Sequence, residues 1–159
     1  MNPTVLIVED SLTVRMDLHA SFEADGFRTI LCATGAEART AFAAGRFQVA
    51  VLDMGLPDAD GMDLLRELHA QPGLDNTVTM LLAGGKDVAD RSHGLRIGAD
   101  EYVVKPYDAG YVVARARQLL GVPHSDDTRS TVLVIDDSIT FRQRLVELLE
   151  PEGYAVLTA

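Results

Sequence analysis

Short apolar runs alternate with amphipathic stretches along the chain, and this alternation predicts strands and helices in turn. Nearly continuous apolar runs predict five strands, at residues 4–8, 29–32, 48–52, 77–82 and 101–104. Between and after them, apolar residues recur at helical spacing. This predicts helices from Ser11 towards Gly26 and at residues 35–44, 61–70, 88–97 and 109–120. The predicted order is therefore a strand followed by a helix, repeated five times.

The five predicted strands are apolar at almost every position, so both of their faces must be covered. Strands of this kind, separated by helices, are typical of a parallel sheet between two helical layers. The predicted fold class is therefore α/β, with a doubly wound five-stranded parallel sheet. Ligands of such sheets bind outside the carboxyl ends of the strands, where the winding direction changes. We therefore expect the functional site at the ends of the first and third strands.

The chain also contains an internal repeat. Residues 4–32 align without gaps on residues 131–159, an offset of 127, and 10 of the 29 pairs are identical. The segment 131–159 is therefore predicted to be the opening β-α-β part of a second copy. It carries its own acidic pair, Asp136 and Asp137.

The repeat predicts three parts of the chain: a domain at 1–121, a linker at 122–130 and a truncated second copy at 131–159. The linker assignment rests on the Gly, Pro, Ser and Asp content of residues 121–130. The simplest interpretation is a piece of a longer tandem protein. The unpaired edges of the truncated copy suggest that it could pair with a second molecule and form a dimer.

Composition and charge argue against several classes of function. Twenty-four acidic against fourteen basic residues give a formal net charge of −10, which is the wrong sign for binding a nucleic-acid backbone directly. The single cysteine, Cys32, cannot form an internal disulfide. The N-terminus lacks the features of a secretory signal, and no apolar run is long enough to span a membrane. We therefore expect a cytoplasmic protein without a membrane segment.

Three carboxylates follow the first and third predicted strands, where the functional site is expected. Glu9 and Asp10 come directly after the first strand, and Asp53 comes after the third. One acid at a strand end is usually a solvated turn residue or a helix cap. Three acids together repel one another, by about 4 kcal/mol for each pair of charges about 4 Å apart at an effective dielectric constant near 20. Such a cluster requires a cation or raised pKa values, and Mg²⁺ is the cation that suits carboxylates beside a phosphate.

Lys105 is the fourth member of the predicted site. It ends the fifth strand immediately before Pro106. A lone lysine is often a surface charge. Beside three acids, however, its ammonium group is well suited to contact a phosphoryl oxygen.

These residues resemble those of a response-regulator receiver domain of two-component signalling. The resemblance covers residues 4–121 and rests on VLIVEDS, VLDMGLPDADG and GADEYVVKPY. It implies a flavodoxin-like sheet of order 2-1-3-4-5. It also implies that Asp53 accepts a phosphoryl group from a phosphohistidine of a histidine kinase or histidine phosphotransfer protein. Mg²⁺ would be held by Glu9, Asp10, Asp53 and the backbone carbonyl of Gly55, and Lys105 would contact the phosphoryl group.

One position departs from the family pattern. Where the family usually has Ser or Thr at the end of the fourth strand, this chain has Ala83. In the family that hydroxyl bonds the phosphoryl group, while an aromatic residue of the fifth strand, here Tyr102, moves inward. The loss of one hydrogen bond to a charged group, worth roughly 1.5 to 3 kcal/mol, is enough to weaken such a switch.

Three functions are therefore compared. The first is a phosphoacceptor receiver within a hybrid histidine kinase or a tandem regulator, which is not a conventional enzyme. The second is a pseudo-receiver that acts as a protein-interaction module and no longer switches because of Ala83. The third, remote one is a phosphohydrolase of the haloacid dehalogenase type. That family requires a second acid two residues after its nucleophile, where this chain has Gly55.

Overall fold

The computed structural model describes residues 2–84, 98–121, 131–134, 139–149 and 155–158. The chain separates into two compact units, residues 1–122 and 123–159. The predicted helix at 88–97 and the linker at 122–130 lie outside the described residues, as do Asp136 and Asp137. In the parts that are described, no helix has the length and apolar character needed to cross a membrane.

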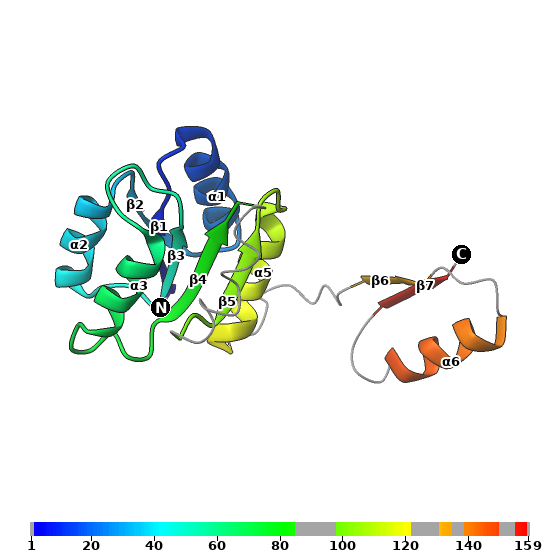
Figure 1. The fold of residues 1–159 in the computed structure, drawn as a ribbon. Helices are drawn as coiled ribbons and strands as arrows, with labels where there is room; N and C mark the ends of the chain where they lie inside the picture. The colour runs from blue at the N-terminus through cyan, green and yellow to red at the C-terminus, as the bar shows by residue number, and fades with distance from the viewer. Residues whose placement is uncertain (1, 85–97, 122–130, 135–138, 150–154, 159) are drawn as a thin grey trace. The chain divides into compact units, whose positions relative to one another are not determined.

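The first unit is built on a five-stranded parallel sheet of order β2-β1-β3-β4-β5, which confirms the expected topology (Figure 1). Its strands are β1 (Thr4–Val8), β2 (Arg28–Cys32), β3 (Val49–Asp53), β4 (Val78–Ala83) and β5 (Glu101–Val104). Strand β1 lies between β2 and β3, and β3 is the central strand. This arrangement makes the ends of β1 and β3 neighbours.

Two helical layers cover the sheet, as the apolar strands predict. One face carries α2 (Gly35–Ala44) and α3 (Gly61–His69), and the other carries α1 (Leu12–Ala24) and α5 (Ala109–Leu120). Alternate residues of each strand feed two separate cores. In β1, Leu6 and Val8 pack with α2 and α3, whereas Val5 and Ile7 pack with α1 and α5. All four side chains are fully buried.

The helix ends follow local capping chemistry. Ser11, Thr34, Asp60 and Asp108 are N-caps whose side chains accept a backbone N–H of the first turn. Gly45 ends α2 in the left-handed conformation, with φ 60°, where a side chain would be strained. The strand boundaries differ from the prediction by one residue in places. β3 and β4 each extend one residue further, so Asp53 and Ala83 are the last residues of their strands.

The second unit is a small β-α-β element made of β6 (Thr131–Val134), α6 (Ile139–Leu149) and β7 (Ala155–Thr158). Its two strands are parallel, as the repeat predicts. Thr131 pairs with Ala155, just as Thr4 pairs with Arg28 in the first unit. Both members of the second pair lie 127 positions after their counterparts in the first, so the register of β6 with β7 repeats that of β1 with β2.

Candidate functional site

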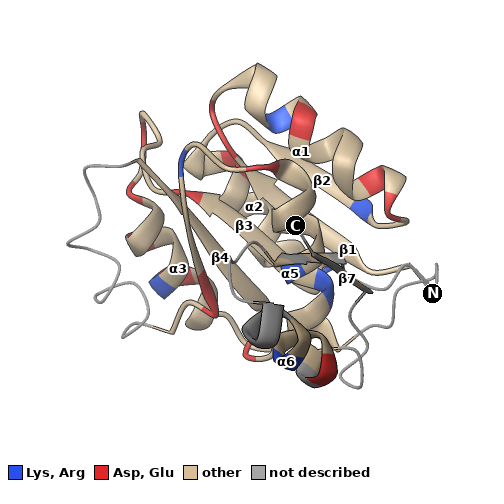
Figure 2. Ribbon diagram, turned by 90° about the vertical axis from the view of Figure 1, so that its right-hand side faces the viewer, with Lys and Arg blue, Asp and Glu red and all other residues tan. Residues whose placement is uncertain are grey.

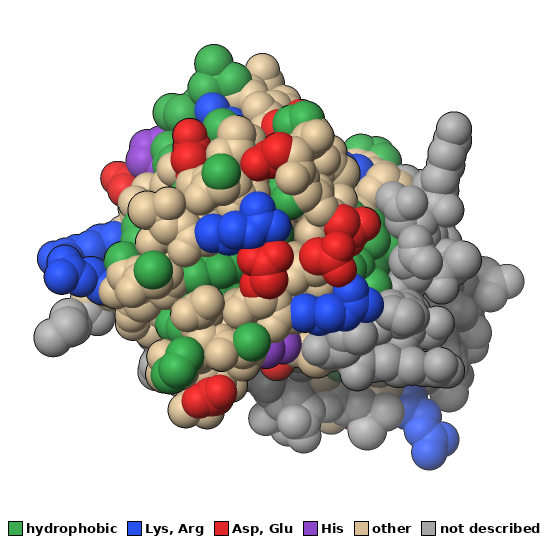
Figure 3. All heavy atoms as spheres, turned by 60° about the vertical axis from the view of Figure 1, so that its left-hand side comes forward, with side chains coloured by type: hydrophobic (Ala, Val, Ile, Leu, Met, Phe, Trp, Pro, Cys, Tyr) green, Lys and Arg blue, Asp and Glu red, His purple; other side chains and the backbone are tan. Residues whose placement is uncertain are grey.

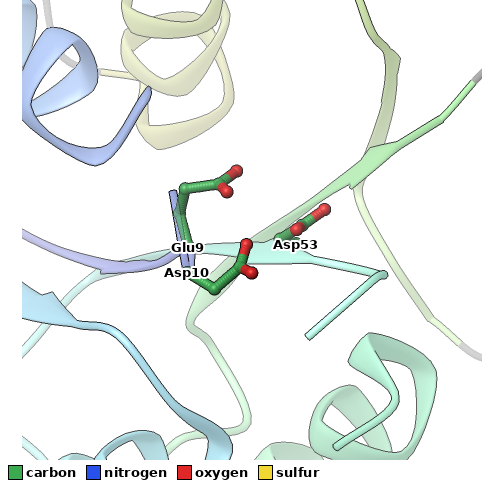
Figure 4. Close-up of side chains that lie close together, drawn as sticks. All are labelled: Glu9, Asp10 and Asp53. Atoms are coloured by element: carbon green, nitrogen blue, oxygen red, sulfur yellow. The ribbon is translucent and has the colours of Figure 1, made fainter. Parts of the chain in front are cut away.

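The three predicted carboxylates converge at the carboxyl end of the sheet. Glu9 and Asp10 directly follow β1, and Asp53 is the last residue of the neighbouring strand β3. Each offers a carboxylate oxygen, and these three oxygens all lie within 4.8 Å of one another. Figure 4 shows Glu9 and Asp10 projecting from the end of β1, with Asp53 beside them. Glu9 and Asp53 are buried, whereas Asp10 is exposed.

Lys105 joins this cluster from the far edge of the sheet. Its Nζ atom donates to Glu9 Oε2 at 2.8 Å and to Asp53 Oδ1 at 2.9 Å. Its backbone N–H donates to the carbonyl of Ala83, which fixes the start of the loop after β5. Burial lowers the pKa of Lys105, but the two carboxylates outweigh burial and raise that pKa above 10.5. The lysine is therefore a cation held between two acids.

Every polar group of Glu9 has a partner. Its N–H donates to the carbonyl of Cys32 at 3.1 Å. Its carbonyl accepts from the Arg15 guanidinium at 2.6 Å. Its two carboxylate oxygens accept from the backbone N–H of Ser11 and from Lys105. Burial nevertheless raises the pKa of the Glu9 carboxyl above its usual value, because loss of water is the largest effect at a side chain that is 1% exposed.

The loop between β3 and α3 passes close to Asp53. A Cβ built on Gly55 would lie 4.0 Å from Asp53 Oδ2, so this residue borders the carboxylate. Gly55 also forms an isolated bridge with Asp60, the N-cap of α3. Gly61 lies still closer, and a Cβ there would be 2.5 Å from the backbone oxygen of Asp53. Small residues at these places let the loop pass beside the acid.

The same loop is tied to helix α2 by Asp58, which the sequence did not single out. Asp58 Oδ1 accepts from the N–H of Gly35 at 2.8 Å, and its Oδ2 accepts from the N–H of Ala36 at 3.1 Å. The bond from Gly35 is the main reason that the pKa of Asp58 is lowered. Asp58 and Gly35 are 23 residues apart and are brought together only by the fold. The local sequence around either residue therefore did not predict this contact.

Replacing Asp58 with alanine is expected to lower the melting temperature by a few degrees at neutral pH. The native pKa of Asp58 is below its ordinary value of 3.8. Its contribution is therefore present above that pH and is lost as pH falls through the native pKa. Thermal melts over a pH series, with Asp75→Ala as an exposed control, check this. A difference from wild type that is absent at pH 7, or that stays constant under acid conditions, would contradict it.

Ala83 and Tyr102 lie where the sequence placed them. Ala83 ends β4 and is fully buried, and it offers no hydroxyl group to the site. Its neighbour Leu82 pairs with Asp53 across the two strands and also lacks a hydroxyl. Tyr102 is 4% exposed and belongs to the same core as Ala83. The aromatic ring of β5 is therefore already inside the protein in this structure.

Tyr107, two residues after Lys105, was not predicted as part of the site. Its hydroxyl oxygen is buried and has no hydrogen-bond partner among the described residues. Burial is the main cause that raises the pKa of Tyr107 to about 12. The hydroxyl group therefore remains protonated at physiological pH.

Outside the acidic site, charges of opposite sign lie next to one another. Figure 2 shows basic positions dispersed among acidic ones on the part of the chain that the structure describes. On the side of α2 and α3, brought forward in Figure 3, Arg39 contacts Glu67 at 2.7 Å and Arg66 contacts Asp63 at 2.5 Å. Nothing on these described surfaces resembles a continuous basic track for a phosphate backbone.

Comparison with known proteins identifies relatives over most of the first unit. The family model for the response regulator receiver domain matches residues 5–117. The aerobic respiration control protein ArcA of Escherichia coli K12 is 37% identical over 118 residues, which cover 74% of this chain and 48% of ArcA. The response regulator protein PmrA of Pseudomonas aeruginosa is 39% identical over 115 residues, covering 72% and 51%. The chain spans about half the length of these curated relatives.

Solved structures agree on the fold. A receiver domain of a Francisella response regulator superposes with a TM-score of 0.69 at 28% identity, covering 76% of this chain and 98% of its own. The receiver domain of a sensor histidine kinase from Pseudomonas aeruginosa PAO1 superposes with a TM-score of 0.68 at 25% identity, covering 76% and 99%. That structure has a magnesium ion coordinated in its active-site cleft. From the matched residues, the sheet order and the acidic pocket, we conclude that this chain belongs to the response regulator receiver domain family of two-component signalling.

Proposed function

We propose that the first unit is a phosphoacceptor that receives a phosphoryl group on Asp53. An Asp53 carboxylate oxygen forms the new P–O bond, and the P–N bond of a donor phosphohistidine breaks. The donor imidazole keeps the electron pair of that bond and takes up a proton. The product is an acyl phosphate. The observation that carries this proposal is that Asp53 lies beside both Lys105 and the acid pair Glu9 and Asp10 at the carboxyl end of the sheet.

The donor set fits Mg²⁺. It consists of the carboxylates of Glu9, Asp10 and Asp53, whose oxygens lie within 4.8 Å of one another. Hard oxygen ligands of this kind are those that Mg²⁺ prefers. We propose that these residues hold the ion together with the carbonyl of Gly55. When bound, the ion would neutralise charge between an anionic nucleophile and an anionic phosphoryl group.

Lys105 would act on the phosphoryl group itself. Its Nζ atom is 2.9 Å from Asp53 Oδ1, so it is already next to the carboxylate that would be phosphorylated. It is a compact cation with three donors, and it is held in place by Glu9 on the other side. Positioning and charge neutralisation are the main requirements of phosphoryl transfer.

Treatment with Mg²⁺ and the small phosphodonor phosphoramidate tests this function. Intact-protein mass spectrometry is expected to show one added phosphoryl group in the wild type and none in Asp53→Asn. Asp75→Asn, a change of the same kind at an exposed acid outside the site, is the control and should be labelled like the wild type. Labelling that persists in Asp53→Asn would refute the assignment.

A pseudo-receiver is the second candidate, and Ala83 is the observation that favours it. This buried residue cannot donate a hydrogen bond to a phosphoryl group, and Tyr102 already lies inside the core. Such a domain would accept a phosphoryl group without a structural response, or would not accept one at all. Amide NMR spectra before and after phosphorylation separate the two candidates, because a switching receiver shifts signals well beyond the acidic site.

We propose a histidine kinase or a histidine phosphotransfer protein as the partner that supplies the phosphoryl group. We assign no direct nucleic-acid contact to this unit, because the chain has a net charge of −10 and its basic side chains are dispersed. Some relatives, such as the probable transcriptional regulator ycf27 of Cyanophora paradoxa, are named for transcriptional control. This chain covers 47% of that protein.

We also propose that the second unit is the beginning of a second receiver copy in a tandem or hybrid arrangement. The matching register of β6 with β7 and of β1 with β2 supports this. In the first unit β1 also pairs with β3, whereas in the described part of the second unit β6 pairs only with β7. Pairing of this edge with a second molecule would give the dimer that the repeat suggests. Light scattering that gives a monomeric mass both for the whole chain and for a variant without residues 131–159 would argue against the dimer.

A further inference from the structure

We infer that Arg15 is a positioning residue of the acidic site, which holds the backbone of Glu9 and Asp10 so that both carboxylates face Asp53. The inference rests on the proposed function of this site. It adds a residue that lies outside the set of three acids and Lys105.

The contacts of Arg15 are made to the backbone of the acid pair. Its Nη1 atom donates to the carbonyl of Glu9 at 2.6 Å and to the carbonyl of Asp10 at 3.2 Å. One guanidinium nitrogen therefore bridges two consecutive peptide groups. Rotation of either peptide would break one of these bonds and turn the attached carboxylate away from Asp53.

The place of Arg15 in helix α1 is unfavourable for the helix itself. Ser11 is the N-cap, and the backbone N–H of Arg15 donates to the Ser11 carbonyl at 2.9 Å in the first helical turn. A cation near a helix N-terminus opposes the helix dipole, and α1 has no acidic residue in its first turn to offset it. A residue that weakens its own helix and contacts the site is expected to have a role in that site.

The internal repeat keeps this arginine. In the alignment at offset 127, Arg15 matches Arg142, together with Asp10 matching Asp137 and Ser11 matching Ser138. The residues directly beside it change, because Val14, Met16 and Asp17 correspond to Phe141, Gln143 and Arg144, whereas Thr13 and Leu18 are identical to Thr140 and Leu145. The arginine is thus retained together with the acid and the serine, while the residues directly beside it differ.

Arg15 also completes the set of bonds that fixes Glu9. The N–H of Glu9 bonds to Cys32, and its carboxylate bonds to Ser11 and Lys105, so only its carbonyl depends on Arg15. Removing that bond would leave the Glu9 carbonyl without its donor at one of the most buried residues of the site. Partners that orient ligand groups in this way typically change metal affinity by 10- to 100-fold when they are replaced.

Substitutions at Arg15 separate a positioning role from an effect of charge. Arg15→Lys keeps the charge, but its nitrogen ends one bond short and cannot bridge both carbonyls. Arg15→Gln removes the charge as well. Loss of a nearby cation alone would strengthen binding of Mg²⁺, whereas loss of the bridge would weaken it. Arg28→Lys, at an exposed arginine on β2, is the matched control.

The measurements are Mg²⁺ titration by calorimetry, thermal melting, and backbone amide shifts of the metal-free protein. Arg15→Lys is expected to bind Mg²⁺ about tenfold more weakly, with the melting temperature close to that of the wild type. The amide signals of Asp10 and Ser11, which follow the two bridged carbonyls, should move without metal. Arg15→Gln should also bind more weakly, and Arg28→Lys should match the wild type.

Wild-type affinity in Arg15→Lys, or tighter binding in Arg15→Gln, would overturn the inference. Unchanged amide shifts at Asp10 and Ser11 would overturn it independently of any metal. Failure of the proposed function looks different, because the wild-type protein itself would then neither bind Mg²⁺ nor incorporate a phosphoryl group on Asp53.

Discussion

Replacing Lys105 with methionine is expected to lower the free energy of unfolding by about 2 to 3 kcal/mol at neutral pH without Mg²⁺. Methionine keeps the length of the side chain and removes only the cation. Glu9 and Asp53, which are 1% and 5% exposed, then face each other without their shared partner. The lysine side chain is 29% exposed, so we place the loss below that of a fully buried pair. Urea denaturation of the two proteins measures the difference.

The pH dependence of the Lys105→Met variant gives a second readout. The pKa of Glu9 is already raised by burial, and loss of Lys105 removes the interactions that oppose this rise. A carboxyl whose native pKa is raised binds more protons in the native state, so stability increases as pH falls towards that pKa. The variant should therefore approach the wild type on mild acidification. Arg46→Met, which removes an exposed cation, is the control. A gap that widens in acid would contradict this account.

Replacing Gly61 with alanine is expected to reduce the rate of Asp53 phosphorylation by about 100-fold and stability by about 1 to 3 kcal/mol. The added Cβ would lie 2.5 Å from the Asp53 backbone oxygen and 2.8 Å from the Met54 Cα atom. Both neighbours are backbone atoms, so the end of β3 must shift to relieve the contact. A displacement of about 1 Å at a reacting group is enough for a loss of this size.

Gly73→Ala is the matched control for Gly61→Ala. Gly73 has φ +86° and open space around it, so alanine there costs about 1 to 2 kcal/mol through backbone strain alone. Phosphorylation with phosphoramidate, followed by mass spectrometry, should proceed at the wild-type rate in this control. Equal phosphorylation rates in the two variants would show that Gly61 does not position Asp53.

The sequence predicted most of the sheet because its strands are apolar on both faces. Five strands and the described helices of the first unit lie within one or two residues of the predicted ranges. The convergence of Glu9, Asp10, Asp53 and Lys105 was also predicted, since parallel strands end at one edge of the sheet. Strand order came from the family resemblance, because apolar patterning does not show which strands are neighbours.

Contacts that loops make with distant parts of the chain could not be predicted from the sequence. Asp58 reads as an ordinary turn acid, and its bonds to Gly35 and Ala36 depend on how α2 lies against the β3–α3 loop. Arg15 gave a partial signal, because the repeat keeps it, but the pattern did not show that its side chain turns back to the acid pair. Tyr107 gave none, because an unsatisfied hydroxyl group is visible only in a packed structure.

The division of β1 between two cores also decides which acid is hidden. Glu9 continues the alternation of Val5 and Ile7, and Asp10 continues that of Leu6 and Val8. Deleting one residue within β1 would move the β1 side chains after the deletion from one core to the other, and it would bring Asp10 to the place of Glu9. Insertions and deletions are therefore tolerable only in pairs of residues or outside β1. The same alternation that assigns the β1 side chains to the two cores also decides which acid is buried at the end of the strand.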